Sequence, residues 1–190
     1  KHGDRVLDIG CGNGRFLPLV KERDAHYTGI DYSEGLISEA RHLHPEGKFL
    51  IGDATRLPFP DNTFDVVYSF ATIHHIPGRE LRAQFVREAA RVLRPGGTLI
   101  LSAWKLWGFR HFGVLLLGVM RSMLGFTPLD VGDVLLTFGK NKEQRYLHAF
   151  TKTELSKLFA KNGFTILDIN IIPRPSGEKN IVVVAKRVVS

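Results

Sequence analysis

Three glycines at alternate positions, Gly10, Gly12 and Gly14, follow an apolar run that contains one acid, Asp8. Glycine permits a positive φ and lets a ligand lie against the main chain. The free N–H groups of a helix that follows such a turn attract polar or anionic groups. The turn therefore predicts a site for a nucleotide-like cofactor. Its spacing is G-x-G-x-G rather than the dinucleotide fingerprint G-x-G-x-x-G, and an ordinary strand-to-helix turn is the alternative.

Acids and histidines stand at the ends of later predicted strands. Asp31 lies 21 residues after Gly10 (31 − 10), where an acid at a strand tip meets ribose hydroxyls. Asp53 follows the third strand, where it could also simply cap a turn. His74 and His75 follow the fourth strand, where turn hydrogen bonding is the alternative to a functional role.

The elements that must position these residues alternate between strands and helices. Apolar runs predict strands over 5–10, 26–31, 48–52, 64–70 and 98–103, and helical spacing predicts helices over 15–23, from Ser33 to about 43, and over 79–94. A capping box at 151–154 begins another helix, to about 161, and strands at 164–172 and 180–188 form a hairpin. We predict an α/β fold: a doubly wound, mostly parallel seven-stranded sheet with helices on both faces and an antiparallel C-terminal hairpin.

Two helices carry predicted core stripes. The first stripe is Leu36, Ile37, Ala40 and Leu43, and the second is Leu81, Phe85, Ala89, Val92 and Leu93. On the second helix, Arg82, Arg87, Glu88 and Arg91 are expected to face outwards. Pro95-Gly96-Gly97 is expected to stop that helix.

Composition indicates one domain, 1–190, with a 44% hydrophobic fraction that supports a sizeable core. The net charge of +7 favours an anionic partner such as nucleic acid, or serves solubility alone. A single cysteine, Cys11, excludes an internal disulfide and fits a cytoplasmic location. Without a signal peptide or an apolar run of about 18–20 residues, we expect no stable membrane insertion. Because the sequence starts at Lys1 without Met, we expect an N-terminal segment to be missing from it.

The stretch from about 104 to 145 interrupts the alternation and is expected to be a substrate-side insertion or lid. It could hold one apolar helix at 112–124 and then a looser stretch at 125–141. Trp104, Trp107 and Phe109 could stack an unpaired base or pack under the lid.

Several stretches resemble class I S-adenosylmethionine-dependent methyltransferases, over residues 6–103. They read L-D-I-G-C-G-N-G-R, G-I-D-Y-S, G-D-A-T-R-L-P-F, F-D-V-V-Y-S-F-A-T-I-H-H-I and R-V-L-R-P-G-G-T-L-I-L. The resemblance implies S-adenosyl-L-methionine as cofactor, bound by Asp8, Gly10, Cys11, Gly12, Gly14, Arg15, Asp31, Tyr32, Asp53, Ala54, Ser69 and Phe70. Asp31 would take the ribose, Tyr32 would pack on adenine unless it is a core aromatic, and Ser69 and Phe70 would line the methionine end.

A narrower resemblance extends through the insertion. I-H-H-I, L-R-P-G-G-T-L-I-L-S-A-W, G-D-V-L-L-T-F and R-Y-L-H-A-F-T-K-T-E-L are similar to methyltransferases that esterify a carboxymethyl group on the wobble uridine of tRNA. The chain departs from that family at Leu136-Thr137-Phe138 and over 105–130. This resemblance implies tRNA as a partner, and a small activator protein as a possible second subunit.

A carboxylate acceptor is already anionic and needs cationic or hydrogen-bonding groups to place it. His74, His75, Arg145 and His148 are the candidate catalytic residues, with Arg110 a weaker one. A neutral hydroxyl acceptor would instead require a histidine base. No metal site is expected, because no carboxylate ligand lies near these histidines in sequence.

Three functions are compatible with these features. The first is an RNA methyltransferase. The second is a small-molecule or lipid methyltransferase acting on O, N or C, with 112–126 as a hydrophobic lid. The third is a non-enzymatic cofactor-binding or scaffolding subunit, against which the intact glycine turn and Asp31 argue.

Overall fold

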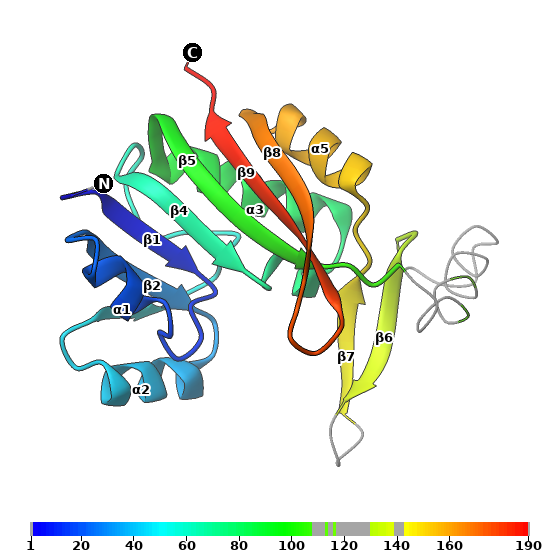
Figure 1. Ribbon diagram of the computed structural model, residues 1–190, viewed down its shortest axis with the longest axis horizontal. Coiled ribbons are helices and arrows are strands. Elements are labelled where there is room, and N and C mark those ends of the chain that lie inside the picture. The colour runs from blue at the N-terminus through cyan, green and yellow to red at the C-terminus, as the bar shows by residue number, and fades with distance from the viewer. Residues whose placement is uncertain (1, 108–112, 114–115, 117–129, 139–142, 190) are drawn as a thin grey trace.

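A seven-stranded sheet forms the centre of the protein, which the computed structural model describes over residues 2–107, 113, 116, 130–138 and 143–189 (Figure 1). The strand order is β3-β2-β1-β4-β5-β9-β8. The first five strands are parallel, β9 is antiparallel to β5, and β8 is antiparallel to β9. The strands are β1 Arg5–Ile9, β2 His26–Asp31, β3 Lys48–Ile51, β4 Phe64–Phe70, β5 Leu93–Trp104, β8 Phe164–Pro173 and β9 Lys179–Arg187. The predicted fold class, including the C-terminal hairpin, is confirmed.

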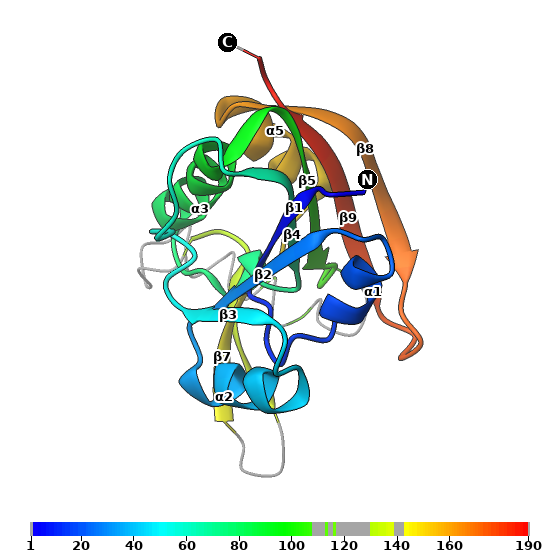
Figure 2. The same ribbon diagram turned by 90° about the vertical axis from the view of Figure 1, so that its left-hand side faces the viewer.

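Helices cover both faces of this sheet. Figure 2 shows α3 and α5 on one side and α1 on the other. The helical elements are α1 Leu17–Lys21, α2 Glu34–Leu43, the 3-10 turn η1 Ile73–His75, α3 Arg79–Val92 and α5 Lys152–Lys161. Two helix starts carry the predicted caps, because Ser33 Oγ accepts from the Leu36 N–H and Thr151 Oγ1 accepts from the Glu154 N–H. No helix in the described part of the chain has the length and apolar composition needed to cross a membrane.

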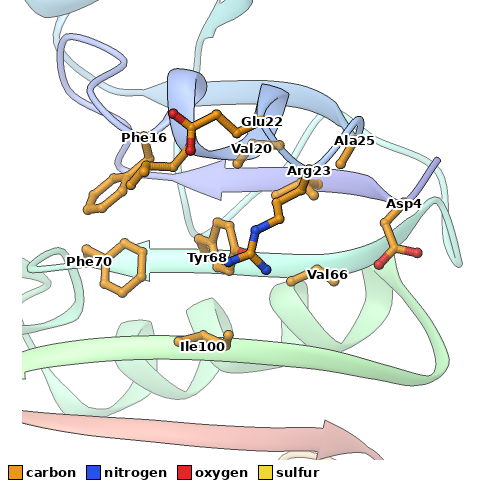
Figure 3. A pocket seen from close by; sticks show the side chains of 12 residues that line it. Asp4, Phe16, Val20, Glu22, Arg23, Ala25, Val66, Tyr68, Phe70 and Ile100 are labelled. Atoms are coloured by element: carbon orange, nitrogen blue, oxygen red, sulfur yellow. The ribbon is translucent and has the colours of Figure 1, made fainter. Parts of the chain in front are cut away.

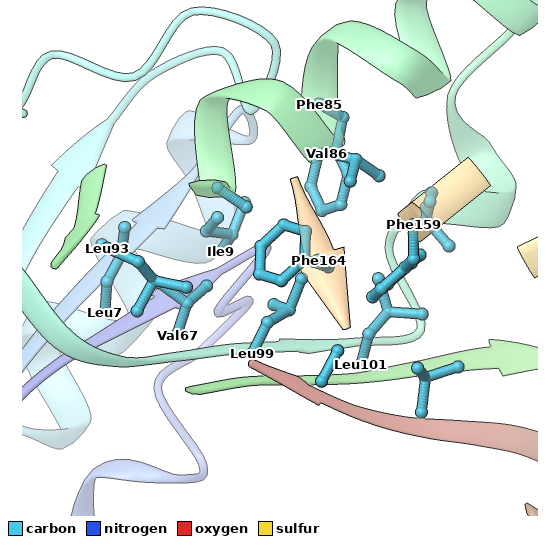
Figure 4. Packing of buried hydrophobic residues seen from close by; sticks show 14 of the residues in the cluster. Leu7, Ile9, Val67, Phe85, Val86, Leu93, Leu99, Leu101, Phe159 and Phe164 are labelled. Carbon is cyan, nitrogen blue, oxygen red and sulfur yellow. The ribbon is translucent and has the colours of Figure 1, made fainter. Parts of the chain in front are cut away.

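The main core lies between the sheet and helices α3 and α5 (Figure 4). Strand residues such as Leu7, Val67 and Leu101 meet Phe85 of α3 and Phe159 of α5, and all five are fully buried. A second cluster packs α1 and α2 against the other face through Leu17, Val20, Ile37, Ala40, Tyr27 and Phe49. The two clusters make the strand ends a rigid edge on which a site can be built.

Some predicted boundaries are wrong. The first helix is five residues long rather than nine, because the turn at Gly14 continues to Leu17, whose N–H bonds the Gly14 carbonyl at 2.9 Å. Helix α3 ends at Val92, and Pro95-Gly96-Gly97 lies inside β5 instead of separating helix from strand. The pairing of β5 with β4 shifts register between Phe64 and Val66, and this irregularity accommodates the proline and the glycines.

The stretch 125–141, which was predicted to lack regular secondary structure, contains a strand. A separate antiparallel two-stranded sheet consists of strands β6 (Asp133–Phe138) and β7 (Glu143–His148). Val134 and Leu147 pack with Leu106 and Ala149 in a small third cluster, which supplies the burial that the sequence pattern did not reveal. The predicted helix at 112–124 and Phe109 lie outside the described residues, apart from Gly113 and Leu116.

Candidate active site

The glycine turn joins β1 to α1 with positive φ at each of its glycines, +75° at Gly10, +56° at Gly12 and +79° at Gly14. Gly10 and Cys11 donate their N–H groups to the Ile30 carbonyl at 2.8 and 3.1 Å, which ties the turn to the end of β2. A Cβ at Gly10 would lie 2.1 Å from Thr72 Oγ1, whereas a Cβ at Gly12 would meet nothing within 4 Å. Gly10 therefore permits close packing, while Gly12 leaves open space beside the turn.

Asp31 at the tip of β2 organises the same turn. Its Oδ2 accepts from the Gly12 N–H and its Oδ1 accepts from the Ser33 N–H, both at 2.9 Å. A carboxylate has about four lone-pair positions, so each oxygen retains capacity for one more donor. The arrangement suits a pair of adjacent hydroxyl groups, as sequence reasoning predicted for a ribose.

A cavity of about 720 Å³ opens beside the turn, which is within the range of sites for cofactor-sized ligands. Eight predicted cofactor residues line it: Gly10, Gly12, Arg15, Asp31, Tyr32, Asp53, Ala54 and Phe70. Tyr32 is 83% exposed, so it is not the core aromatic that was the alternative. An open space at Gly12, an acceptor-rich carboxylate and an exposed ring together fit a nucleoside-bearing cofactor.

Two leucines predicted for the core face this cavity instead. Leu36 of α2 and Leu81 of α3 are 40% and 41% exposed and both line it, while Leu43, 51% exposed, is also outside the core. Thr72, Ile76 and Pro77 complete the same wall and were not predicted. Their position directly after β4 was the available signal, since ligands bind beyond the carboxyl ends of parallel strands.

The remaining predicted cofactor residues lie behind the cavity wall. Asp8 is buried, and Tyr27 Oη donates to its Oδ2 at 2.8 Å. Burial raises the pKa of Asp8 to about 7, although the Tyr27 hydrogen bond and Arg15 oppose this. Cys11 is buried with a raised pKa, caused by burial and by the nearby acids Asp8 and Asp31, so it is no thiolate nucleophile. Ser69 Oγ donates to the Ile9 carbonyl at 3.0 Å, and this bond ties β4 to β1.

Asp53 caps a turn at the edge of the cavity. Its Oδ1 accepts from the N–H of Thr55 at 2.7 Å and from the Thr55 hydroxyl at 2.8 Å, which is the turn-capping arrangement. Asp53 and Ala54 also line the cavity. A cap that holds the Ala54 backbone beside the cavity is compatible with contact to a ligand edge.

The two adjacent histidines of η1 have different surroundings. His75 lines the cavity, whereas His74 is fully buried and stacks on Trp104 with ring centroids 4.8 Å apart. Burial, and then the charges of His75, Arg174 and His148, hold the pKa of His74 well below its ordinary value. His74 Nδ1 accepts from the Trp104 N–H at 3.4 Å, and its Nε2 has no partner among the described residues. Of the pair, His75 is the one placed to touch a ligand.

Phe70 separates this cavity from a smaller hollow of about 370 Å³ on the α1 side of the sheet (Figure 3). The rings of Phe16 and Phe70 lie 4.5 Å apart, and the Arg15 guanidinium lies 5.2 Å from the centre of the Phe16 ring. Figure 3 shows both rings near the carboxyl ends of β1 and β4, with Tyr68 and Val66 further back, towards the start of β4. The aromatic pair thus closes the end of the cavity near Arg15.

The tryptophans considered for base stacking pack against protein. Trp107 Nε1 donates to the Ala149 carbonyl at 2.7 Å, and Trp107 packs on the cluster of Leu106, Val134 and Leu147. Trp104 lies between His74 and the Arg174 guanidinium, which is 4.8 Å from its ring centre. Both tryptophan side chains therefore pack against the protein, which was the alternative to stacking on an unpaired base.

His148 and Arg82 belong to a polar cluster, which we call the hub and which also contains Asp130, Asp133, Tyr146 and Glu154. Arg82, Asp133 and His148 are buried, and the other three are partly exposed. His148 Nδ1 lies 2.6 Å from Asp133 Oδ1, and His148 Nε2 lies 2.7 Å from Glu154 Oε1. Because ionised carboxylates only accept, both ring nitrogens carry protons and the ring is an imidazolium. Burial lowers the pKa of His148, but these two hydrogen bonds outweigh it and the net shift is upwards.

Arg82 was predicted to face outwards, and this is wrong. It is 2% exposed and donates to Asp130, Tyr146 and the Ile76 carbonyl. Apart from the carbonyl of Ile76, these partners lie 48 or more residues away from Arg82 along the chain. Tyr146 and His148 lie two residues apart on β7, opposite Leu135 and Asp133 of β6 respectively. The alternation of polar groups along β7 was the available signal.

The hub predicts a pH-dependent stability. A histidine with a raised folded-state pKa stabilises fully below its unfolded value of about 6.5, and the stabilisation is lost as pH rises through the folded-state pKa. We expect His148→Gln to lower the free energy of unfolding by about 2–4 kcal/mol at pH 6 and by less at pH 9. Thermal melts of both proteins across this range measure the difference. A deficit that does not shrink with rising pH would contradict the imidazolium assignment.

The known proteins that this chain resembles include several methyltransferases. A family model described as "Methyltransferase domain" matches residues 7–101. A protein of Encephalitozoon cuniculi described as a methyltransferase is 34% identical over 169 residues, which is 86% of this chain and 71% of that protein. The tRNA (carboxymethyluridine(34)-5-O)-methyltransferase of Saccharomyces cerevisiae is 38% identical over 104 residues, 55% of this chain and 37% of that enzyme. The 27-O-demethylrifamycin SV methyltransferase of Amycolatopsis mediterranei is 41% identical over 111 residues, 55% of this chain and 40% of that enzyme.

The fold is also that of solved structures. An S-adenosylmethionine-dependent methyltransferase of Methanosarcina mazei superposes with a TM-score of 0.87 at 23% identity, covering 100% of this chain and 95% of that one. A methyltransferase in complex with the Haloferax volcanii Trm112 methyltransferase activator has a TM-score of 0.70 at 18% identity and covers 100% of this chain and 84% of that one. At these identities the likeness shows the fold alone.

Proposed function

Because this chain belongs to the methyltransferase-domain family, and is an S-adenosylmethionine-dependent methyltransferase, we propose that it methylates tRNA, at a carboxymethyl group on wobble uridine. S-Adenosylmethionine supplies an activated methyl group on a sulfonium, so the chain has to bind it, exclude water and aim the acceptor. The chain spans 40% or less of the yeast and Amycolatopsis relatives, so their activities are used here only as support.

We place the cofactor in the cavity of about 720 Å³. Asp31 holds the ribose hydroxyls, and the adenine lies near Tyr32, Asp53 and Ala54. The methionine end lies towards Arg15 and Phe70, with Gly10 and Gly12 allowing close approach to the main chain. Asp8, Cys11, Gly14 and Ser69 support the turn and the strand ends without touching the cofactor.

The observation that carries the acceptor assignment is the meeting of η1 and β7. His75 lines the cavity and forms a hydrogen bond with the backbone of Tyr146 in β7. Arg145 directly precedes Tyr146 in the same strand. Partial burial and the Arg145 charge lower the pKa of His75, despite that hydrogen bond, so His75 is neutral at pH 7. A carboxylate needs no base, and Arg145 with His75 supplies one cation and one neutral hydrogen-bonding group to position it.

His74 and His148 then act indirectly. His74 stacks behind His75, with ring centroids 4.4 Å apart, and His148 belongs to the hub. The net charge of +7 supports a polyanionic substrate, and the yeast relative by its printed name modifies carboxymethyluridine in tRNA. We also propose a cytoplasmic location and a small activator protein as partner, the latter supported by the solved complex with an activator.

The test uses the chemistry of the product. Bulk tRNA treated with mild alkali carries free carboxymethyl groups, and untreated tRNA is the matched control. We expect labelled S-adenosylmethionine to label the treated tRNA preferentially, with the label released as methanol by alkali because the product is an ester. Alkali-stable label, or label in small acids or lipids and none in tRNA, would overturn the proposal.

A second candidate is methylation of a small molecule, favoured by the 41% identity to the rifamycin-modifying enzyme over 111 residues. The apolar wall formed by Leu36, Leu81, Ile76 and Pro77 would suit such an acceptor. Label found in small hydroxylated compounds under the same conditions would support this candidate instead.

A further inference from the structure

We propose that Arg82 is a positioning residue for methyl transfer: its buried guanidinium fixes η1 and β7 relative to each other and so holds His75 at the cavity. The inference rests on the proposed function in one respect, that the His75 side of the cavity receives the acceptor. Sequence reasoning gave Arg82 no role beyond solvent exposure.

The contacts of Arg82 join three elements. From α3, its Nη1 donates to the Ile76 carbonyl at 3.3 Å and to Tyr146 Oη at 2.8 Å, and its Nη2 donates to Asp130 Oδ2 at 2.9 Å. Ile76 directly follows η1 and lines the cavity, and Tyr146 is in β7. One side chain thus links the cavity wall to the two-stranded sheet.

The hub extends this link. Tyr146 Oη donates to Asp133 Oδ1 at 2.6 Å, and Asp130 Oδ2 also accepts from the Arg79 N–H at 2.7 Å. Burial opposes ionisation of Asp133, but hydrogen bonds from His148 and Tyr146 outweigh it and lower the pKa of this acid. Two cations, Arg82 and His148, therefore balance the buried carboxylate of Asp133 and its neighbours Asp130 and Glu154.

Contacts with β7 hold His75 in position. Element η1 has three residues and no side-chain cap at its start, so it has little to fix it from within. The Tyr146 backbone bonds His75, and Arg145 lies close enough to influence its charge. If β7 loses its anchor to Arg82, His75 loses both neighbours at once.

The shape of the guanidinium decides which substitution is informative. A lysine keeps the charge near Asp130 and Asp133 but has no planar fork that reaches Ile76, Tyr146 and Asp130 together. Arg82→Lys should therefore fold while loosening the link. Arg82→Met also removes one of the two cations that balance the buried Asp133, and the only one of the two that pairs with Asp130 among the described residues, so it is expected to be much less stable. The matched control is Arg87→Lys, on an exposed side of α3, where Arg87 pairs with Glu80.

The experiment measures three quantities on the full chain: the pKa of His75 by NMR, the affinity for S-adenosylhomocysteine by calorimetry, and kcat and KM with the alkali-treated tRNA. For Arg82→Lys we expect the His75 pKa to rise towards its ordinary value and kcat to fall roughly tenfold to 100-fold. We expect the affinity for S-adenosylhomocysteine to change less than about threefold, because Arg82 bonds Ile76, Asp130, Asp133 and Tyr146 rather than Asp31 or the glycine turn. Arg87→Lys should resemble the unchanged protein.

A His75 pKa and a kcat that match those of Arg87→Lys would overturn the proposal, even if the melting temperature falls. The NMR and calorimetric measurements need no methyl acceptor. Failure of tRNA to be labelled by the unchanged protein would count against the proposed function, while an unmoved His75 pKa in Arg82→Lys would count against the role of Arg82.

Discussion

Replacing Asp31 with alanine is expected to weaken S-adenosylhomocysteine binding by about 100-fold or more while the protein stays folded. Hydrogen bonds to a charged group are worth about 1.5–3 kcal/mol each, and two ribose hydroxyls would lose their acceptor. The variant also removes the acceptors of the Gly12 and Ser33 N–H groups, which are only partly buried, so that water can replace the lost carboxylate. Calorimetric titration with S-adenosylhomocysteine gives the affinity, and circular dichroism checks the fold.

Two further variants make this result specific. Asp31→Asn keeps the shape and one acceptor oxygen, so we expect an intermediate loss. Asp168→Ala changes an exposed acid on β8, far from the cavity, and should leave the affinity unaltered. Equal affinity for Asp31→Ala and Asp168→Ala would mean that the ribose is placed wrongly.

Replacing Gly10 with alanine is expected to damage both stability and cofactor binding. The new Cβ would lie 2.1, 2.7 and 2.9 Å from three side-chain atoms of Thr72, in a backbone conformation with φ +75°. The conformation costs roughly 1 kcal/mol for a non-glycine residue, and overpacking adds about 1–3 kcal/mol. Because Thr72 also lines the cavity, its displacement should weaken S-adenosylhomocysteine binding about tenfold or more. Chemical denaturation and calorimetry measure the two effects.

Gly12 provides the matched control for Gly10. It also has a positive φ, but a Cβ there meets nothing within 4 Å, so Gly12→Ala should cost about 1 kcal/mol in stability. A double variant, Gly10→Ala with Thr72→Ala, should recover part of the stability lost in Gly10→Ala, since two of the three clashing atoms are gone. Equal destabilisation by Gly10→Ala and Gly12→Ala would show that the contact with Thr72 is unimportant.

Much of the cofactor side could be predicted because it depends on short-range rules. Gly10, Gly12 and Asp31 are identified by spacing, and parallel strands joined by helices bring their carboxyl ends to one edge of the sheet. The structure gathers these residues around one cavity, and their contact with the cofactor stays a prediction. The different positions of His74, which is buried, and His75, which lines the cavity, could be learned only from the structure, because neighbouring side chains in a tight turn point in different directions.

Periodicity and local motifs were enough to predict the family, the sheet with its C-terminal hairpin, and the edge at which the cofactor should bind. Which polar residues are buried could be learned only from the folded structure. Arg82 has an unremarkable place on an amphipathic helix, and its burial depends on Asp130 and Asp133, which are 48 and 51 residues away. The two-stranded sheet of β6 and β7 likewise depends on long-range packing, of Val134 and Leu147 with Leu106. Interactions between distant segments have no local signature, and they position the side of the cavity where we propose that the acceptor binds.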